Sequence, residues 1–280
     1  MPEKTKTFFI TGVSTGFGRA LSEAALASGH RVVGTLRSEL ERGSFDLLNP
    51  GQSFGKLLDV TDNAGIPAVV AEVEATVGPI DVLVNNAGYG HEGMIEESPL
   101  EDIRRQFEVN VFGAVAVTKA VLPYMRQRRA GHIINITSMG GIITFPGLGY
   151  YHASKFALEG LSETLAKEVK DFGISVTAVK PGGFRTDWAG RSMVRAPRQI
   201  ADYDALMDPV RKARQERNGK QAGDPVKAAQ AILQCVQSPN PPVHLLLGSD
   251  ALALIREKLS YLTNEIETWE KITISTDATT

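Results

Sequence analysis

The sequence predicts an α/β protein in which helices cover both faces of a parallel sheet of about seven strands, giving a three-layer, doubly wound arrangement. Short runs of nearly continuous apolar residues alternate with longer stretches of helical periodicity. Such runs are typical of strands that are covered on both sides. No linker or low-complexity stretch divides the 280 residues. We therefore expect a single domain over residues 1–280.

Seven apolar runs supply the expected strands. In chain order they are Phe8–Ile10, Arg31–Leu36, Phe54–Leu58, Ile80–Val84, Ile133–Ile136, Ile174–Val179 and Val243–Leu247. The run at Phe54–Leu58 is the weakest of these patterns. Strand–helix alternation at this spacing is what a parallel sheet requires, because each crossover must return the chain to the same edge.

Helical periodicity predicts the elements between the strands. The expected helices lie near 18–28, 64–77, 99–127, 151–171, 204–218, 225–237 and 250–270. Ser98–Pro99 and Asp224–Pro225 each place a capping residue before a proline that can open a helix. Three segments are expected to be irregular: Glu39–Ser53, a long insertion from Gly182 to about Asp204, and a polar C-terminal tail over about 272–280.

Charge and cysteine content exclude several classes of function. Lys and Arg number 30 against 32 Asp and Glu, a net charge of −2, which offers no general attraction to nucleic acid or an anionic membrane. Cys235 is the single cysteine, so we expect neither an internal disulfide nor a cysteine-based metal cluster. The opening MPEKTKTFFITG lacks the apolar core of a signal sequence, and no later run has the length of a membrane span. We expect a cytoplasmic protein without a metal.

A glycine-rich loop joins the first strand to the first helix. It reads Thr11-Gly12-Val13-Ser14-Thr15-Gly16-Phe17-Gly18. Glycines let the backbone approach a ligand, and free N–H groups at the helix start attract negative charge. A plain strand–helix turn could use the same glycines, but this position favours the phosphate-binding loop of a Rossmann fold. The candidate cofactor contacts here are Gly12, Ser14, Thr15, Gly16, Phe17 and Gly18.

The end of the second strand bears on the choice of dinucleotide. NAD-selective sites carry an acidic residue there, which accepts a hydrogen bond from the ribose 2′-hydroxyl. This chain has no acid at that point and has Arg37 instead. A guanidinium pairs bidentately with a 2′-phosphate, and the Thr15 hydroxyl could assist. The sequence therefore favours NADP over NAD, with an ordinary surface arginine as the alternative.

Tyr151-His152-Ala153-Ser154-Lys155 opens a strongly periodic helix. Residues four apart lie one above the other on a helix, so Tyr151 and Lys155 share a face. An ammonium beside a phenol stabilises the phenolate, and we expect it to lower the pKa of Tyr151 from its usual value of about 10. Such a group suits general acid–base catalysis near neutral pH. Taken alone, the pair could equally be an incidental Tyr and Lys.

Further polar and glycine signals follow the later strands in a definite order. They are Asn85-Asn86-Ala87-Gly88 after the fourth strand, Asn110 inside a helix, Ser138 after the fifth strand, and Pro181-Gly182 with Thr186 after the sixth. Together with the glycine loop and the Tyr-x-x-x-Lys pair, these residues resemble the short-chain dehydrogenase/reductase family. The resemblance runs from about residue 7 to residue 247.

The resemblance implies a role for each member of a catalytic group. Tyr151 would be the acid/base, Lys155 would hold the nicotinamide ribose and tune Tyr151, and Ser138 would bind the substrate oxygen. Asn110 would interrupt its helix and hold a water that links Lys155 to solvent. The neighbouring Tyr150 fits less well, because the residue four positions after it is Ser154 rather than a lysine.

The resemblance also implies further cofactor contacts. Asp59 would touch the adenine amino group beside the backbone of Val60, although a strand-end turn residue is the plainer interpretation of Asp59. Pro181 and Gly182 would lie by the nicotinamide, and Thr186 would bind its carboxamide or the pyrophosphate. The adenosine would be flanked by Asn86, Ala87 and Gly88.

The insertion over about 183–222 would form a lid on the substrate. Its aromatic and methionine residues, Phe184, Trp188, Met193, Tyr203 and Met207, suggest an apolar roof. The arginines Arg185, Arg191, Arg195 and Arg198 are expected to be solvated surface charges. His91 and His152 are expected in the pocket wall or on the surface, without a catalytic role. The lid and the end of the second strand resemble a branch that includes hydroxysteroid and retinol dehydrogenases.

The resemblance implies an oxidoreductase that transfers hydride between NADP(H), or NAD(H), and an alcohol or carbonyl substrate. A dinucleotide-binding sensor or scaffold without catalysis is the alternative on the same fold. A methyltransferase would need an acid after the second strand, and an extended epimerase or dehydratase would have a TGxxGxxG loop. Family members pair through the helices at 99–127 and 151–171, so a homodimer or homotetramer is expected.

Overall fold

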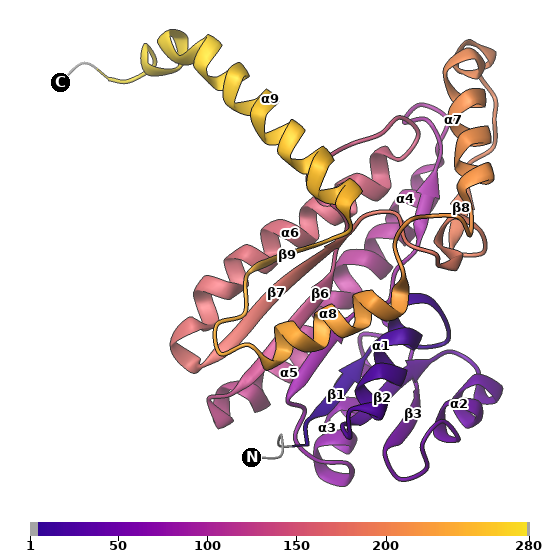
Figure 1. Cartoon of the computed structure of the whole chain (residues 1–280), viewed down its shortest axis with the longest axis vertical. Helices are drawn as coiled ribbons and strands as arrows, with labels where there is room; N and C mark the ends of the chain where they lie inside the picture. The colour runs from indigo at the N-terminus through magenta and orange to yellow at the C-terminus, as the bar shows by residue number, and fades with distance from the viewer. Residues whose placement is uncertain (1–4, 279–280) are drawn as a thin grey trace.

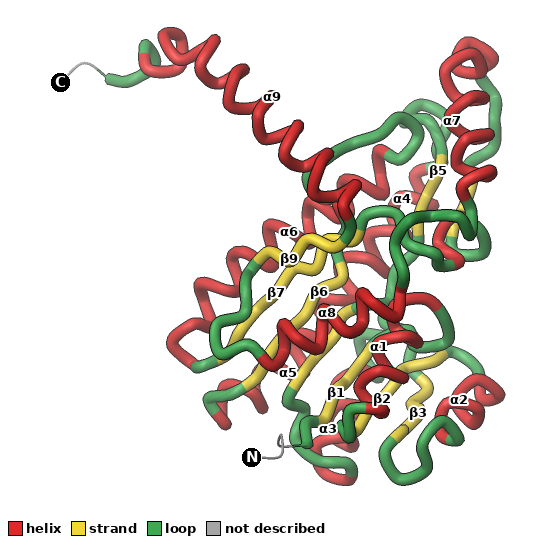
Figure 2. The backbone as a smooth tube through the Cα atoms, viewed as in Figure 1, coloured by secondary structure: helices red, strands yellow, loops and turns green. Residues whose placement is uncertain are grey.

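The protein is described by a computed structural model that covers residues 5–278. A seven-stranded parallel sheet with the order β3-β2-β1-β4-β6-β7-β9 forms its centre (Figures 1 and 2). The strands are β1 Thr7–Ile10, β2 Arg31–Leu36, β3 Ser53–Leu57, β4 Val82–Asn85, β6 Gly131–Ile136, β7 Ile174–Pro181 and β9 His244–Leu247. All seven expected strands and the doubly wound α/β class are confirmed. The strand order reverses between β1 and β4, where such sheets bind ligands.

Helices pack on both faces of the sheet, as predicted. The α-helices of the described residues are α1 Gly16–Ala27, α2 Glu39–Asp46, α3 Ile66–Thr76, α4 Leu100–Phe107, α5 Ala114–Arg128, α6 Gly149–Val169, α7 Asp204–Arg217, α8 Pro225–Gln237 and α9 Ser249–Ile274. One apolar core joins the sheet to α1 and α8, and a second core joins the opposite face to α3 and α5. The strands are buried on both sides for this reason, which explains their nearly continuous apolar runs.

The helix expected over 99–127 is broken into three pieces. A π-helical turn, Glu108–Gly113, separates α4 from α5 and contains Asn110. π-Helical turns widen a helix locally and occur frequently at functional sites. The interruption that the family resemblance implied at Asn110 is therefore present, and it turns the Asn110 side chain toward α6.

Two expectations about secondary structure were wrong. The segment Glu39–Ser53, expected to be irregular, contains α2, whose first turn is capped by the Ser38 side chain accepting a hydrogen bond from the Glu41 N–H. The insertion after β7 contains β8 (Met193–Arg195), which pairs in parallel with β5 (Gly90–Glu92) in a small second sheet. Three-residue strands are too short to leave a periodic pattern.

The last helix runs longer than predicted. The sequence indicated a helix near 250–270 and a polar tail over about 272–280, whereas α9 continues to Ile274. Figure 1 shows α9 projecting away from the sheet and its helices. Residues 1–4 and 279–280 lie outside the described residues. The last two of these form the end of the expected tail. Within residues 5–278, no helix combines the length and the apolar character needed to cross a bilayer.

Candidate active site

A cleft of about 1580 Å³ opens at the carboxyl ends of the strands. Its walls come from the β1–α1 loop, the ends of β2, β3, β4, β6 and β7, the start of α6, and α7 with the segment before it. Drug-sized ligands occupy pockets of roughly 300–1,000 Å³. The cleft therefore has room for a dinucleotide and a second molecule together.

Most of the predicted site residues line this cleft. Those that do are Gly12, Ser14, Thr15, Gly16, Phe17, Arg37, Asp59, Val60, Asn86, Ala87, Gly88, Ser138, Tyr151, Lys155, Pro181, Gly182 and Thr186. Gly18 and Asn110 lie behind its wall. Residues from six separate strand ends are thus brought to one cavity, because all parallel strands end at the same edge of the sheet.

The conformation of the glycine loop is fixed by close packing against the residues after β4. Gly12 has a φ of +70°, which favours glycine. A Cβ on Gly18 would lie 2.3 Å from the Gly12 carbonyl oxygen and 2.5 Å from Asn86 Nδ2. Asn86 Nδ2 donates to the carbonyl oxygens of Thr11 at 2.9 Å and Gly12 at 2.8 Å. Gly18 therefore lets helix α1 start against the loop, and the loop presents backbone N–H groups to the cleft.

Arg37 and Asp59 stand together at the ends of β2 and β3. Partial burial raises the pKa of Asp59, but the Thr61 N–H and hydroxyl donate hydrogen bonds to its carboxylate. The positive charges of Arg37 and Arg105 act in the same direction as those bonds, and the pKa of Asp59 falls below its usual value. The end of the cleft thus carries a fixed carboxylate beside a guanidinium.

Arg191 was expected to be a solvated surface charge; it is exposed, but it also reaches the cleft. Its Nη2 donates to Thr15 Oγ1 in the glycine loop at 3.0 Å and lies 3.7 Å from a carboxylate oxygen of Asp187. The guanidinium lines the cleft although its side chain is 61% exposed. It therefore adds a positive charge, besides that of Arg37, near the glycine loop. The sequence could not reveal this contact, because Arg191 lies 176 residues from Thr15.

Tyr151 is buried in the cleft wall, with 6% of its surface exposed. Burial raises the pKa of Tyr151 to about 12, and a hydrogen bond with Ser138 only partly opposes this. Lys155 Nζ lies 5.9 Å from the centre of the Tyr151 ring. The expectation that Lys155 lowers the pKa of Tyr151 was therefore wrong for the protein without a cofactor, because removal of the phenolate from water has the larger effect.

Lys155 is fixed on the same wall. Its Nζ donates to the Ile136 carbonyl oxygen at 2.9 Å. Burial lowers the pKa of Lys155 to about 8, and the negative charge of Glu159, one turn along α6, opposes this. The ammonium is thus held between the end of β6 and the cleft, with donors left for a ligand hydroxyl.

The loop after β6 is shaped by His152. Ser138 Oγ accepts a hydrogen bond from the Gly140 N–H at 2.9 Å. His152 Nδ1 lies 2.8 Å from the Gly140 carbonyl oxygen, and its Nε2 accepts from the Phe145 N–H at 2.9 Å. These partners fit a neutral ring, and burial lowers the pKa of His152. His152 therefore positions the Ser138 loop from the wall of the cleft, one of the two places expected for it from the sequence.

Tyr150, the competing tyrosine, is engaged elsewhere. Its hydroxyl donates to the Ile95 carbonyl oxygen at 2.9 Å, and its ring packs against His91 with centres 6.2 Å apart. Tyr150 does not line the cleft, whereas Tyr151 and Ser138 do. The geometry thus favours Tyr151 as the reacting tyrosine.

Asn110 organises the segment behind Gly88. Its Oδ1 accepts from the Tyr89 N–H at 3.1 Å, and its Nδ2 donates to the Tyr89 carbonyl oxygen at 3.0 Å and to Ser154 Oγ at 3.1 Å. A Cβ on Gly88 would lie 3.1 Å from Asn110 Oδ1 and 3.7 Å from Lys155 Nζ. Asn110 therefore ties the end of β4 to α6 directly behind Lys155.

The lid is anchored by a buried carboxylate that the sequence did not single out. Glu92 on β5 is 2% exposed and pairs with Arg195 of β8 and with Arg211 and Arg214 of α7. Below this anchor, the Trp188 ring lies 5.0 Å from the Tyr151 ring. Of the five residues predicted to form the roof, Phe184 and Trp188 line the cleft. Met193, Tyr203 and Met207 do not, so the prediction was wrong for these three.

Asp250 is a second residue that the sequence did not reveal. Its Oδ2 accepts a hydrogen bond from the Gly183 N–H at 2.7 Å, and a Cβ on Gly182 would lie 2.2 Å from its Oδ1. Asp250 is in the first turn of α9 and lines the cleft. It therefore fixes the glycines after β7 at the mouth of the site.

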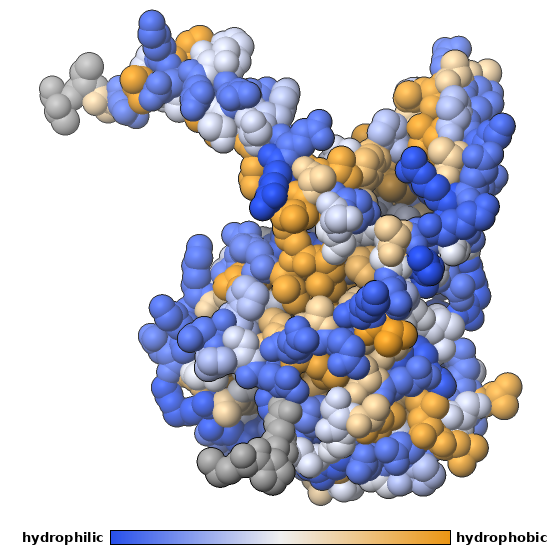
Figure 3. Space-filling view, in the orientation of Figure 1, coloured by the Kyte–Doolittle hydropathy of each residue, from blue (hydrophilic) through white to orange (hydrophobic). Residues whose placement is uncertain are grey.

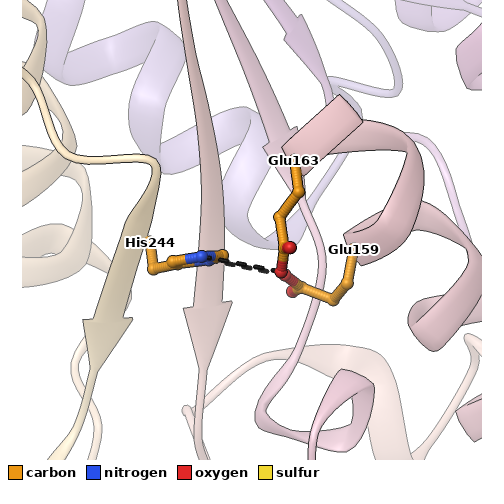
Figure 4. Close-up of side chains that lie close together, drawn as sticks. All are labelled: Glu159, Glu163 and His244. Atoms are coloured by element: carbon orange, nitrogen blue, oxygen red, sulfur yellow. Dashed lines mark ion pairs between the residues drawn. The ribbon is translucent and has the colours of Figure 1, made fainter. Parts of the chain in front are cut away.

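Glu159, Glu163 and His244 lie close enough together to resemble a cation site (Figure 4). Lys180 already fills that place, because its Nζ lies 2.8 Å from both Glu159 Oε2 and His244 Nδ1. The cluster is therefore a buried ion pair capped by a histidine at the edge strand β9, and we assign no metal to it.

Comparison with known proteins gives a consistent result. A family model described as short chain dehydrogenase matches residues 6–195. An "Oxidoreductase BOA17" from Botryotinia fuckeliana is 38% identical over 277 residues, covering 97% of this chain and 99% of that protein. A 3-ketodihydrosphingosine reductase from Bacteroides thetaiotaomicron is 38% identical over 260 residues, covering 90% of this chain and 91% of that protein.

Solved structures match over most of the chain. A short-chain dehydrogenase from Streptomyces avermitilis is 41% identical, with a TM-score of 0.92 over 99% of this chain and 100% of that one. A relative from Burkholderia phymatum in complex with NAD is 25% identical, covering 91% and 93% with a TM-score of 0.79. A serine dehydrogenase complexed with NADP⁺ is 26% identical, covering 86% and 94% with a TM-score of 0.74.

Proposed function

The chain belongs to the short-chain dehydrogenase/reductase family, and we propose that it reduces a ketone or aldehyde with NADPH and runs the reverse oxidation of the alcohol. The observation that carries this proposal is the placement of Tyr151. Its hydroxyl is buried beside Ser138 and Lys155, in the same cleft as the glycine loop. A proton donor and a dinucleotide cradle are thus adjacent, as coupled hydride and proton transfer requires.

The residues of the cleft fit a dinucleotide. The backbone of the glycine loop would receive the pyrophosphate, and the Asp59 and Arg37 end would receive the adenosine. Lys155 would bind the nicotinamide ribose beside the glycines after β7. When bound, the nicotinamide supplies the hydride, and the protein supplies orientation and charge placement.

The chain's own groups handle the substrate oxygen. Ser138 and Tyr151 hydroxyls donate hydrogen bonds to that oxygen, which fixes the carbonyl carbon toward the cofactor side of the cleft. Tyr151 then gives its proton as negative charge develops on the oxygen. The positive charge of Lys155 stabilises the phenolate that remains, and the Trp188 roof excludes water from the exchange.

The preference for NADPH rests on the charges at the end of β2. Arg37 lines the cleft where a ribose 2′-substituent would lie, and the residues at the end of β2, Thr35, Leu36 and Arg37, include no acid. Arg191 adds a second guanidinium at Thr15. Arg37 would bind a 2′-phosphate through charge-assisted hydrogen bonds, and Arg191 would add positive charge for the cofactor's phosphates at the glycine loop.

The substrate that fits the roof is apolar around its carbonyl group. Val210 and Ala213 of α7 line the cleft with Trp188, Phe145 and Leu148. The same segment also contributes Arg214, Arg217 and Lys220 to the lining, so cations lie beside this apolar wall. The similar reductase from Bacteroides thetaiotaomicron has a 3-keto lipid in its name. We therefore propose a ketone on a long-chain or ring-shaped apolar molecule. The single Cys235, which is buried, supports a cytoplasmic location for this reaction.

Absorbance at the reduced-nicotinamide band tests the proposal. Purified protein is mixed with NADPH or NADH and a panel of apolar ketones and aldehydes, together with small polar carbonyls as a control. We expect loss of NADPH absorbance with apolar carbonyls. Tight NADPH binding without turnover on any carbonyl, or on any alcohol with NADP⁺, would instead support a dinucleotide sensor.

A further inference from the structure

Helix α9 leaves the body of the molecule after its first turns (Figure 1). Ala251 and Ile255 are buried, but every described residue from 263 onward is exposed. We call the part over residues 256–274 the C-terminal arm. It is 19 residues long, and helices in proteins owe most of their stability to the packing of an apolar face rather than to intrinsic propensity. An arm that is exposed on all sides therefore points to a partner surface.

The arm carries a regular apolar seam. Leu252, Ile255, Leu259, Leu262, Ile266 and Trp269 follow one another at alternating steps of three and four residues. This is the spacing of the contact positions in a two-helix coiled coil. The seam begins in the body, where Ile255 is 4% exposed. It continues outward through Leu259 at 53%, Ile266 at 67% and Trp269 at 57% exposure.

The charges beside the seam indicate what covers it. Arg256 and Lys258 flank its first half, and Glu265 and Glu270 flank its second half. A parallel pair of such helices would bring Glu265 of one beside Glu270 of the other. An antiparallel pair brings the basic half of each helix against the acidic half of its partner, which is favourable on both sides.

We propose that the arms of two copies of this chain pair in antiparallel orientation. Leu259 of one copy packs against Leu262 of the second copy, and the Trp269 of each arm covers Leu252 at the base of the other. Lys258 faces Glu265 of the second copy on each side. This surface is separate from α5 and α6, through which the family resemblance led us to expect pairing.

The charge of the arm argues against a lipid surface as the occupant. Residues 256–274 contain Arg256, Lys258 and Lys271 against four glutamates, which is a net charge of −1. Helices that lie on anionic membranes are rich in Lys and Arg on the polar face. A second copy would both cover the apolar seam and pair with the flanking charges, whereas a membrane would only cover the seam.

Pairing also reaches the proposed active site. Asp250, in the first turn of α9, holds the Gly183 N–H at the mouth of the cleft. Figure 3 shows apolar side chains gathered around the place where α9 leaves the body, next to this turn. A partner's arm lying along α9 would therefore restrain the helix that positions the glycines after β7.

Matched isoleucine variants test the pairing by sedimentation of the full chain over a range of concentrations. Ile266→Asp changes a seam position, and Ile274→Asp changes an equally exposed residue outside the seam, since the two are 67% and 61% exposed. We expect Ile266→Asp to raise the Kd of association at least about tenfold, with unchanged thermal unfolding of the body. Equal behaviour of both variants and the unaltered protein would overturn the proposal.

Tryptophan emission reports on the arm directly, whatever other interface the protein uses. The chain has two tryptophans, and Trp188→Phe leaves Trp269 as the single emitter. We expect its emission to shift to the blue as concentration rises, and we expect Ile266→Asp to abolish the shift. Emission typical of an exposed indole at all concentrations would overturn the proposal.

Charge reversal tests the orientation. In the antiparallel pair, Lys258→Glu and Glu265→Lys each place like charges together and weaken association, and the double variant restores it. In a parallel pair, Glu265→Lys would instead strengthen association by removing the contact with Glu270. Stronger association of Glu265→Lys, or a double variant as weak as the single ones, would contradict the antiparallel arrangement.

Discussion

In the proposed reaction, the burial of Tyr151 determines the direction, reduction or oxidation, for which its hydroxyl is in the right protonation state. With a pKa of about 12, the hydroxyl keeps its proton at neutral pH in the protein without a cofactor. A protonated tyrosine is ready to donate to a carbonyl oxygen, whereas alcohol oxidation needs the phenolate. Lys155, with a pKa of about 8, carries the positive charge that would stabilise the phenolate once formed.

The reduction rate should accordingly fall at alkaline pH. Tyr151 stays protonated well above pH 8, so its own titration does not limit the reaction there. Lys155 loses its charge as pH rises through about 8, and with it the stabilisation of the phenolate. We expect kcat/KM for carbonyl reduction to be flat from about pH 6 to 7 and to fall as the pH rises through about 8. A rate that rises between these limits would contradict the assignment.

Arg37 should decide between the two dinucleotides. Arg37→Gln removes the guanidinium that binds the 2′-phosphate in the proposed NADPH complex, and NADH has no such phosphate. We expect the Kd of NADPH to rise about tenfold or more and that of NADH to change by less than about twofold. Arg104→Gln, at an exposed arginine on α4 that does not line the cleft, is the control. Equal losses for both cofactors would argue against a 2′-phosphate contact.

The first turn of helix α1 can form against the glycine loop only because Gly18 has no side chain. Ala at Gly18 would place a Cβ 2.3 Å from the Gly12 carbonyl oxygen, and overpacking of this kind costs roughly 1–3 kcal/mol. Gly43 lies within α2 with no atom within 4 Å of the added Cβ, and Ala there gains about 0.5–1 kcal/mol.

Chemical unfolding measures both changes in parallel. We expect Gly18→Ala to lower the free energy of unfolding and to weaken dinucleotide binding, because the loop must shift. Gly43→Ala should raise the free energy of unfolding and leave binding unchanged. A Gly18→Ala protein with unaltered stability and affinity would show that the loop does not need this close packing.

The sequence predicts well those elements whose buried residues form a continuous apolar run. Strands such as Arg31–Leu36 are apolar throughout because helices cover both faces. Helix α2 escaped prediction because its single buried residue, Phe45, leaves no apolar periodicity. The π-helical turn at Asn110 was expected only from the family resemblance, since its contacts with Tyr89 and Ser154 lie far from it in sequence and leave no trace in the periodicity.

The candidate site divides in the same way. Residues that directly follow a strand, such as Arg37, Asp59 and Ser138, could be placed in the cleft from the sequence, because parallel strands end at one edge. Arg191 and Asp250 could not, because each reaches the site from an insertion or a later helix whose path depends on tertiary packing. The pKa of Tyr151 also depends on burial, which its sequence neighbours do not reveal.

For the whole molecule, buried histidines should set the response to acid. Burial, aided by the positive charge of Lys6, lowers the pKa of His132 to about 4, against about 6.5 in an unfolded chain. Between these values the unfolded state binds more protons, so stability is complete above pH 6.5 and falls as pH drops toward 4. The loss from His132 amounts to about 3 kcal/mol.

Urea unfolding at pH 7 and pH 4.5 checks this prediction. His132 Nε2 lies 2.9 Å from Thr177 Oγ1. The variant His132→Gln keeps a polar partner for this hydroxyl, but the glutamine side chain cannot titrate. We expect the variant to lose less stability between the two pH values than the unaltered protein does. Equal pH dependence in both proteins would mean that His132 is not the group that responds.

The central claim, that Tyr151 donates the proton in carbonyl reduction, is tested most directly by a pair of adjacent variants. Tyr151→Phe and Tyr150→Phe each remove one hydroxyl, and turnover of NADPH with a reducible carbonyl is measured beside NADPH affinity. We expect Tyr151→Phe to lose about 100-fold or more in kcat with NADPH affinity retained, and Tyr150→Phe to stay near the unaltered rate. A Tyr151→Phe protein that keeps more than about a tenth of the rate, a barrier change of roughly 1.4 kcal/mol, would contradict the account.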